Sequence, residues 1–140
     1  MSQTIKKITK TECPTGLRMD FLPNAVGGNI VQCVKYEHLT FAFMDKASPD
    51  YGSGFWNFYS LSNGGFYMAP EIDGDIRMEW EDNYFEGKMS ADAAGISISL
   101  LAQNYFAWHV NRERFADKYH QLLDYAAQHK EAPAIYRFID

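Results

Sequence analysis

Apolar and polar residues alternate in the middle of the chain with the two-residue period of β-strands. Ile76, Met78 and Trp80 alternate with Arg77 and Glu79, a pattern typical of a strand with one buried face and one face in water. Similar alternation or aromatic-rich sequence predicts three further strands, over residues 55–62, 65–70 and 85–89.

Tight turns separate these segments. Asn63-Gly64 tolerates the positive φ angles of a type I′ hairpin turn, and Asp73-Gly74 and Asp82-Asn83 also have turn composition. Because such short connections join antiparallel neighbours, we expect an antiparallel meander of three to four strands spanning about residues 55–89.

The helical period of 3.6 residues dominates on both sides of this meander. Phe115, Tyr119, Leu122 and Ala126 lie at i, i+4, i+7 and i+11. We expect helices over 14–22 (ending at Pro23), over 30–46, over about 91–107 with Ser90 as N-cap, after the N-cap Asn111, and over 132–139. The fold class is therefore α+β, with the meander packed against several α-helices.

The length of 140 residues fits one domain. We expect residues 1–13 to be a flexible tail, since the first eleven residues hold three lysines and no acid, and residues 14–140 to be the single domain. No apolar segment follows the basic start and none is long enough to span a membrane, so neither a secretory signal nor a membrane location is expected. These features predict a cytoplasmic protein.

The net charge of −5 is unevenly distributed. The segment Glu71–Asp92 holds eight acids and two bases, whereas the rest of the chain is close to neutral. An imitation of duplex DNA over the roughly 35–40 Å width of such a domain would need about 20 negative charges. DNA mimicry is therefore not expected, and without a basic face neither is direct binding to nucleic acid.

No motif for catalysis or metal binding is present. The four histidines and two cysteines form no ligand pair, and the chain lacks a nucleophile elbow and a phosphate-binding glycine loop. We predict no catalytic residues, no metal and no cofactor. Two alternatives stay open: a small hydrolase that uses the carboxylates of Glu79, Glu81 and Asp82, and a DNA-binding protein that uses the basic tail and exposed aromatic residues.

Two blocks are more specific than any of these patterns: residues 58–70, FYSLSNGGFYMAP, and residues 90–96, SADAAGI. With DFLP at 20–23 and AIYRFID at 134–140, they closely resemble the ArdB/KlcA family of antirestriction proteins. The resemblance implies an α+β protein of plasmids or other mobile elements, without enzyme activity, metal or cofactor. It further implies protection of incoming DNA from type I restriction systems in the bacterial cytoplasm.

The resemblance leaves the contact surface open. It implies a partner that is the type I restriction complex or an associated host protein. Local geometry does not explain Tyr59, Tyr67 and Asp140, so we expect them to face a partner. We also expect the exposed acids Glu79, Glu81 and Asp82 to approach a basic surface and to steer the encounter.

Overall fold

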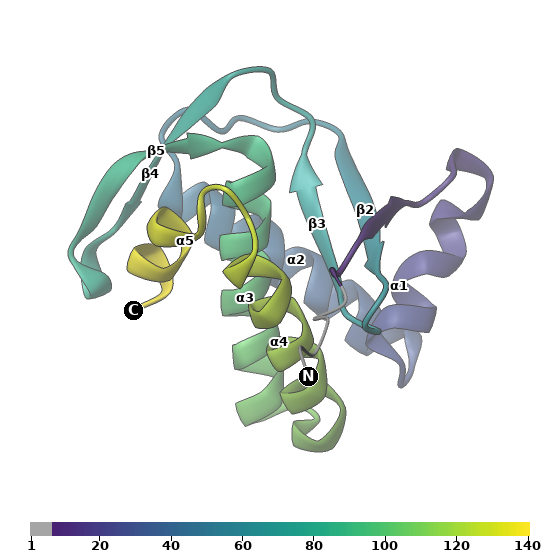
Figure 1. Ribbon diagram of the computed structural model, residues 1–140. Coiled ribbons are helices and arrows are strands. Elements are labelled where there is room, and N and C mark those ends of the chain that lie inside the picture. Colours follow the sequence, from purple (N-terminus) through teal and green to yellow (C-terminus); the bar gives the residue numbers. More distant parts are fainter. Residues whose placement is uncertain (1–6) are drawn as a thin grey trace, which may run out of the picture.

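Five strands in two separate antiparallel sheets combine with five α-helices in the computed structural model, which describes residues 7–140 (Figure 1). The strands are β1 (Lys10–Glu12), β2 (Trp56–Leu61), β3 (Phe66–Pro70), β4 (Asp75–Trp80) and β5 (Phe85–Ser90). The helices are α1 (Arg18–Val26), α2 (Ile30–Ala47), α3 (Ala91–His109), α4 (Arg112–Ala127) and α5 (Ala132–Ile139), with short 3₁₀ turns at Thr15–Leu17 (η1) and Glu81–Asn83 (η2). The predicted α+β class is confirmed.

Part of the predicted tail is ordered. Lys10–Glu12 forms strand β1, which pairs antiparallel with β2 so that Thr11 lies opposite Ser60. Thr9 and Cys13 extend this pairing by backbone hydrogen bonds to Ser62 and Phe58. The prediction of a flexible tail through residue 13 is therefore wrong for this stretch, because backbone groups of β2 hold it. Residues 1–6 of that tail lie outside the described residues.

The β2–β3 hairpin closes with a longer loop than a type I′ turn. Its closing pair is Leu61 and Gly65, and Gly64 donates to the carbonyl of Leu61 at 3.0 Å. Among the loop residues only Gly64 has a positive φ, at 96°. This is a three-residue loop with glycine in the left-handed position. The hairpin itself is as predicted, and its register places Tyr59 opposite Tyr67.

The predicted meander is divided because helix α3 occupies the free edge of β3. The hydroxyl of Ser99 accepts from the Met68 amide at 3.2 Å, and the side-chain amide of Gln103 donates to the Phe66 carbonyl at 2.9 Å. These side chains satisfy backbone groups that a neighbouring strand would otherwise use. Strands β4 and β5 therefore pair only with each other.

Gly95 lets α3 approach β3 this closely. A Cβ atom built on Gly95 would lie 2.4 Å from the Cβ of Ala69 and 2.6 Å from the carbonyl oxygen of Met68. Any other residue here would force the helix away from the strand. The helix that results is buried along most of its length, from Ala91 to Phe106, and forms the centre of the fold.

Helices cover both faces of the three-stranded sheet. On one face Phe21 of α1 stacks on Phe58 with ring centroids 5.1 Å apart, and Tyr36 of α2 lies 5.6 Å from Phe66. On the other face, Tyr125 of α4 stacks on Tyr67 of β3, with ring centroids 5.9 Å apart. In Figure 1 the sheet lies between α1 on one side and α3 and α4 on the other. The sheet thus leaves no whole face open for a partner.

Most predicted helices agree with the structure to within two residues, and Ser90 and Asn111 are N-caps as expected. The first helix differs, because α1 continues through Pro23 to Val26. Leu22 and Val26, which are 7% and 2% exposed, gain burial on either side of the proline. The burial of these two side chains outweighs the backbone hydrogen bond that the helix loses because proline has no N–H.

Contacts with other elements hold the β4–β5 hairpin both near its open end and near its turn. Ser48, just after α2, donates its hydroxyl to the carbonyl of Arg77 at 2.6 Å. Toward the turn, Trp80 and Phe85 pack on Phe138 of α5, with ring centroids 5.5 and 5.4 Å apart. These contacts hold the most acidic segment of the chain on the same side of the molecule as α5 (Figure 1).

Candidate functional site

The predicted acidic surface lies at the turn of the β4–β5 hairpin. Glu79 is half-buried on β4, whereas Glu81 and Asp82 are exposed in η2, and Glu86 is exposed on β5. We call these four acids, together with Tyr84 between them, the acidic tip. The structure therefore brings together the three acids that the sequence predicted.

Arg77 neutralises part of this surface. Glu79 and Glu86 lie directly opposite each other across the two strands, an unfavourable pair of like charges. The guanidinium of Arg77 bridges them, with its Nε 2.8 Å from Glu79 and its Nη2 in contact with Glu86. Glu81 and Asp82 are consequently the acids of the tip that remain available to a partner.

Tyr84 is a feature that the sequence analysis missed. Its side chain is 96% exposed, and its backbone adopts the left-handed conformation with φ of 53°, the sole positive φ outside glycine among the described residues. A bulky residue in this region is uncommon. The conformation points a large, amphipathic side chain into solvent between carboxylates, and no sequence periodicity signals it.

The carboxy-terminal Asp140 lies at the same end of the molecule. The side chain of Asn83 donates to the carbonyl of Phe138 at 2.7 Å, which ties η2 to the last turn of α5. Asp140 itself is exposed. The C-terminus and the β4–β5 hairpin are accordingly close together in Figure 1, so that Asp140 and the acidic tip can face one partner.

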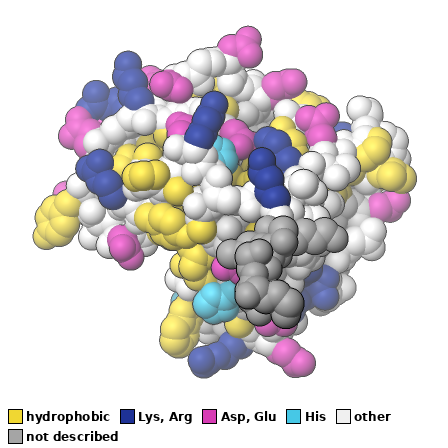
Figure 2. Space-filling view, viewed as in Figure 1, with side chains coloured by type: hydrophobic (Ala, Val, Ile, Leu, Met, Phe, Trp, Pro, Cys, Tyr) yellow, Lys and Arg dark blue, Asp and Glu magenta, His cyan; other side chains and the backbone are white. Residues whose placement is uncertain are grey.

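Charges of both signs are mixed over the face shown in Figure 2, without a continuous patch of either sign. A duplex mimic would need an unbroken negative band, and a duplex-binding face would need an unbroken positive one. This face has neither.

A second polar cluster is partly buried where β1, β3, the start of α3 and the segment between α4 and α5 meet. Asp92, at the start of α3, accepts three hydrogen bonds: from Lys10 at 3.0 Å, from the Tyr67 hydroxyl at 2.6 Å and from His129 at 2.9 Å. We call Asp92 and these three partners the Asp92 cluster. It joins residues that are up to 119 positions apart in the sequence and fixes the first strand to the helices.

The histidine of this cluster has both ring nitrogens occupied. Its Nδ1 accepts from the backbone amide of Glu131 at 3.0 Å, which places the proton on Nε2, the donor to Asp92. The carboxylate of Glu131 in turn accepts from the Ser90 amide at 2.9 Å. His129 thus has no free nitrogen to take a proton from a substrate, and the cluster has the geometry of a structural network.

The pKa values of Asp92 and of the Tyr67 hydroxyl are shifted in opposite directions. Burial by itself would raise the pKa of Asp92, but hydrogen bonds from His129, Tyr67 and Lys10 outweigh it and hold that pKa well below its usual value. Burial, with the negative charge of Asp92 beside it, strongly raises the pKa of the Tyr67 hydroxyl. Asp92 is therefore a stable anion and Tyr67 a stable donor.

Tyr59 and Tyr67 do not form the exposed pair that the sequence suggested. Their rings stack at 4.8 Å, and the Lys10 ammonium lies 4.6 Å from the Tyr59 centroid. Tyr67 is 0% exposed, so the expectation that it faces a partner is wrong. It is buried because α4 covers this face of the sheet with Tyr125. Tyr59 is half-buried, with the Lys10 ammonium over its ring.

Sequence patterns predicted only part of the Asp92 cluster. The N-cap Ser90 placed Asp92 in the first turn of a helix, but a two-residue turn at Asn63-Gly64 would set Tyr59 opposite Met68, whereas the longer loop sets it opposite Tyr67. No spacing rule connects His129 to Asp92, because they meet only when α3 and α4 pack together.

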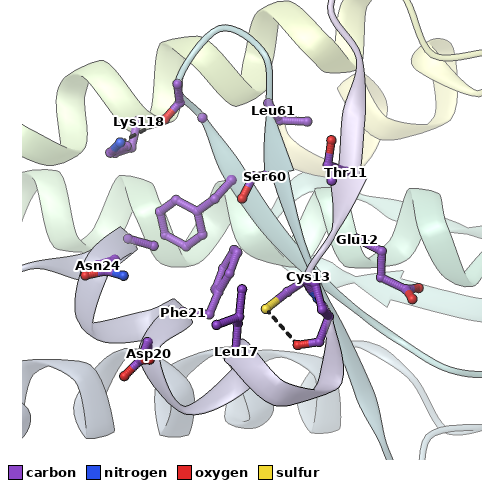
Figure 3. A pocket seen from close by; sticks show the side chains of 15 residues that line it. Thr11, Glu12, Cys13, Leu17, Asp20, Phe21, Asn24, Ser60, Leu61 and Lys118 are labelled. Carbon is purple, nitrogen blue, oxygen red and sulfur yellow. Dashed lines mark hydrogen bonds between the residues drawn. The ribbon is translucent and has the colours of Figure 1, made fainter.

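A groove of about 420 Å³ lies between α1, β1 and the β2–β3 hairpin. Figure 3 shows Cys13, Leu17 and Phe21 at one end of it and Lys118 at the other. Cys13 is a free thiol whose sulfur is 3.5 Å from the carbonyl of Pro14, and Lys118 donates to the carbonyl of Gly64 at 2.8 Å. The groove thus combines apolar walls with a thiol and an ammonium that already contact backbone carbonyls.

Residues 7–140 lack two kinds of feature. No group of three or more His, Cys, Asp or Glu side chains in this range is arranged to hold a metal ion. In the same range no helix is both long and apolar enough to cross a membrane.

Comparisons with known proteins agree on one family. Residues 49–140 match the antirestriction protein family. An antirestriction protein KlcA of Escherichia coli is 44% identical over 137 residues, covering 95% of this chain and 94% of the relative. The uncharacterised protein YafX of E. coli K12 is 40% identical over 136 residues, covering 96% of this chain and 89% of the relative.

A solved structure matches the whole fold. It has a TM-score of 0.88 and 38% identity and covers 100% of both chains. It comes from work on the KlcA and ArdB proteins, which describes a novel fold and antirestriction activity against type I DNA restriction systems in vivo but not in vitro. Fold and sequence together define an antirestriction protein. The chain belongs to the ArdB/KlcA family of antirestriction proteins.

Proposed function

We propose that this protein is encoded by a plasmid or another mobile element and protects incoming DNA from type I restriction in the cytoplasm of a bacterial host. The observation that carries this proposal is the match of the whole chain, in sequence and in fold, to KlcA and ArdB proteins. A shared fold alone would not carry a function. Here 38–44% identity over nearly all residues accompanies it.

The protein acts with a component that is present in the cell. The matched KlcA and ArdB proteins have antirestriction activity in vivo but not in vitro. If this chain behaves in the same way, purified restriction enzyme and DNA lack something that the activity requires. The partner is then the restriction complex in its cellular state or an associated host protein.

Protein contacts explain the activity better than DNA mimicry. The net charge of −5 is far below the charge of a duplex of the same length. The acidic tip nevertheless presents Glu81, Asp82 and the exposed ring of Tyr84 at one end of the molecule. Tyrosine is common among residues that dominate binding energies, and surrounding charge acts mainly on association rate.

A non-catalytic role fits the geometry of the polar groups. The hydrolytic alternative requires a carboxylate or imidazole that is free to accept a proton. Of its three carboxylates, Glu79 is engaged by Arg77, whereas Glu81 and Asp82 are free but lie exposed to water in η2, outside a buried site that would position a substrate. Both ring nitrogens of His129 are occupied. We therefore favour binding over hydrolysis.

The test is the plating efficiency of unmodified phage on cells with an active type I system. We expect expression of this protein to raise plating efficiency, and to leave it unchanged in otherwise identical cells without the system. The same protein, purified, is not expected to inhibit the purified nuclease.

Two results would contradict the proposal. One is unchanged plating efficiency at a verified level of folded protein in the cells. The other is an equal rise in cells without the restriction system, which would indicate a general effect on phage infection.

A further inference from the structure

Helices α1 and α2 expose a group of aliphatic side chains on the side of the molecule away from the acidic tip. Met19 on α1 is 92% exposed, and Ile30 and Val34 on α2 are 68% and 46% exposed. These three residues line one groove of about 370 Å³ between the two helices. Exposed aliphatic residues that adjoin on two elements are typical of interaction surfaces, whereas single ones are not.

Two more apolar residues extend the surface. Val31 follows Ile30 and is also 68% exposed. Phe55 is 52% exposed and is connected to the groove by Arg18. Arg18 lines the groove, and its guanidinium lies 4.1 Å from the centroid of the Phe55 ring. We call Met19, Ile30, Val31, Val34 and Phe55 the α1–α2 patch.

Local structure does not account for these residues. β-Branched side chains have below-average helix propensity, so Ile30, Val31 and Val34 do not favour the first turns of α2 by themselves. The buried side of the same helix already has its own apolar residues, among them Cys33, Tyr36 and Met44. The exposed stripe is therefore additional to what the core of the monomer requires.

The charge around the patch is balanced. Residues 14–47 carry three bases and three acids, in contrast to the net −6 of Glu71–Asp92. Arg18 and Glu37 line the same groove with opposite signs. A two-fold interface places the same surface on both sides, so a patch with one charge of each sign is complementary to itself. A strongly charged partner would not be electrostatically complementary to this balanced surface.

We propose that the α1–α2 patch is the interface of a homodimer in solution. The five side chains expose on the order of 600 Å², at the upper end of the range for the largest patch on a monomer and somewhat below the ~800 Å² per partner of a standard interface. An interface of this size is at the low end of specific contacts, so we expect a dimer that dissociates on dilution.

The position of the patch defines what the dimer would present. In Figure 1, α1 and the β4–β5 hairpin lie at opposite sides of the molecule. The two acidic tips therefore stay at the outer ends of the dimer and do not repel each other across the interface. Such an arrangement would offer two copies of the acidic tip to one assembly, and binding of the first would favour binding of the second.

The test is the mass of the full chain in solution by sedimentation velocity and light scattering, over roughly a hundred-fold range of protein concentration. We expect the mass to rise from the 16.1 kDa of the monomer toward twice that value. Because the contact is apolar, added salt should not dissociate the dimer.

The test variant is the double substitution Ile30→Glu with Val34→Glu. Glutamate near the start of a helix is favourable, so the monomer should remain folded while two like charges oppose each other across the interface. We expect it to be monomeric over the same range. The matched control replaces Ile72 and Trp108, which are 36% and 67% exposed outside the patch, with glutamate and should still dimerise.

Mixing two single variants gives an independent check. Ile30→Glu and Ile30→Lys chains should each dimerise poorly, and an equimolar mixture should recover dimer because the introduced charges now attract. A wild-type chain that stays monomeric throughout would overturn the proposal, as would a double variant that still dimerises or a control that does not. Plating assays are not involved, so these outcomes are separate from those that test the antirestriction function.

Discussion

The imidazole Nε2 of His129 lies 2.9 Å from the carboxylate of Asp92, and the backbone amide of Glu131 fixes the ring from its other side at 3.0 Å. This relationship connects the start of α3 to the segment between α4 and α5. It also brings a carboxylate and an imidazole together as in a catalytic dyad, but with no nitrogen left for proton transfer. The pair therefore contributes stability and orientation.

The substitution Asp92→Asn tests the contribution of the carboxylate. The amide retains one acceptor but places donor hydrogens where Lys10, Tyr67 and His129 already donate. We expect the free energy of unfolding at neutral pH to fall by about 2 kcal/mol, as measured by urea denaturation. Asp124→Asn, at an exposed position on α4, is the control. Equal effects of the two substitutions would contradict a special role for the cluster.

The same carboxylate predicts a pH dependence. The pKa of Asp92 is lowered in the folded protein, whereas in the unfolded chain it is about 3.9. Its ionised form therefore stabilises the fold above the unfolded-state pKa, and this stabilisation is lost as pH falls. We expect the difference in unfolding free energy between wild type and Asp92→Asn to shrink below about pH 5.

Both proteins in that comparison keep His129, because its hydrogen bond is the largest of those that hold the pKa of Asp92 down. A difference that stays constant from neutral pH to about pH 3 would show that the carboxyl does not carry the effect.

The substitution Gly95→Ala tests the close packing of α3 on β3. In an ordinary helix this change would stabilise by about 1 kcal/mol, because alanine has the higher helix propensity. Here the new Cβ would lie 2.4 Å from Ala69, so we expect a loss of about 2 kcal/mol or more in unfolding free energy. Gly54→Ala, with open space around the glycine, is the control and should have little effect. A stabilised Gly95→Ala protein would contradict this packing.

The substitution Gln103→Met tests how α3 closes the edge of β3. Methionine has a similar length but cannot donate to the Phe66 carbonyl or to the Tyr36 hydroxyl, which the Gln103 amide reaches at 2.9 and 3.2 Å. We expect the buried carbonyl left without a donor to lower unfolding free energy by about 1–3 kcal/mol. Asn104→Ala, at the exposed neighbouring position, should change it much less.

The acidic tip can be tested by charge reversal. Glu81→Lys and Asp82→Lys change two exposed acids that no ion pair holds among the described residues. We expect the double variant to fold normally and to lose most of the protection of unmodified phage in the plating assay. Glu79 is left unchanged, because reversing it would set two cations side by side with Arg77.

A matched control keeps the total change in charge. Asp45→Lys and Asp124→Lys lie near the C-terminal ends of α2 and α4, where cations are favourable. This double variant should protect as wild type does. If both double variants protect equally, the acidic tip is a solvated surface without a role in binding.

Local sequence signals predicted the elements of this fold well. Ser90 and Asn111 cap their helices as expected, and the loop of the β2–β3 hairpin contains Asn63-Gly64. Each of these depends on the geometry of a few neighbouring residues. The alternation of Ile76, Met78 and Trp80 likewise matches the buried face of β4.

Features that depend on distant contacts were not predictable in this way. Strand β1 has no apolar pattern, since its residues are Lys, Thr and Glu, and it forms because β2 offers an edge. The separation of the two sheets depends on Ser99 and Gln103, which are 31 and 37 positions from the backbone groups that they contact. The burial of Tyr67 depends on α4 in the same way.

The closure of β3 by α3 also affects how the protein could assemble wrongly. Sheets with open edges recruit strands from other chains, which is a route to fibrils. In the three-stranded sheet the β3 edge is blocked by side chains of a buried helix, and the other edge is the three-residue strand β1, with charged residues at both ends. The three-stranded sheet, which holds the aromatic strands β2 and β3, can therefore fold without offering a long open edge as a template for strand addition.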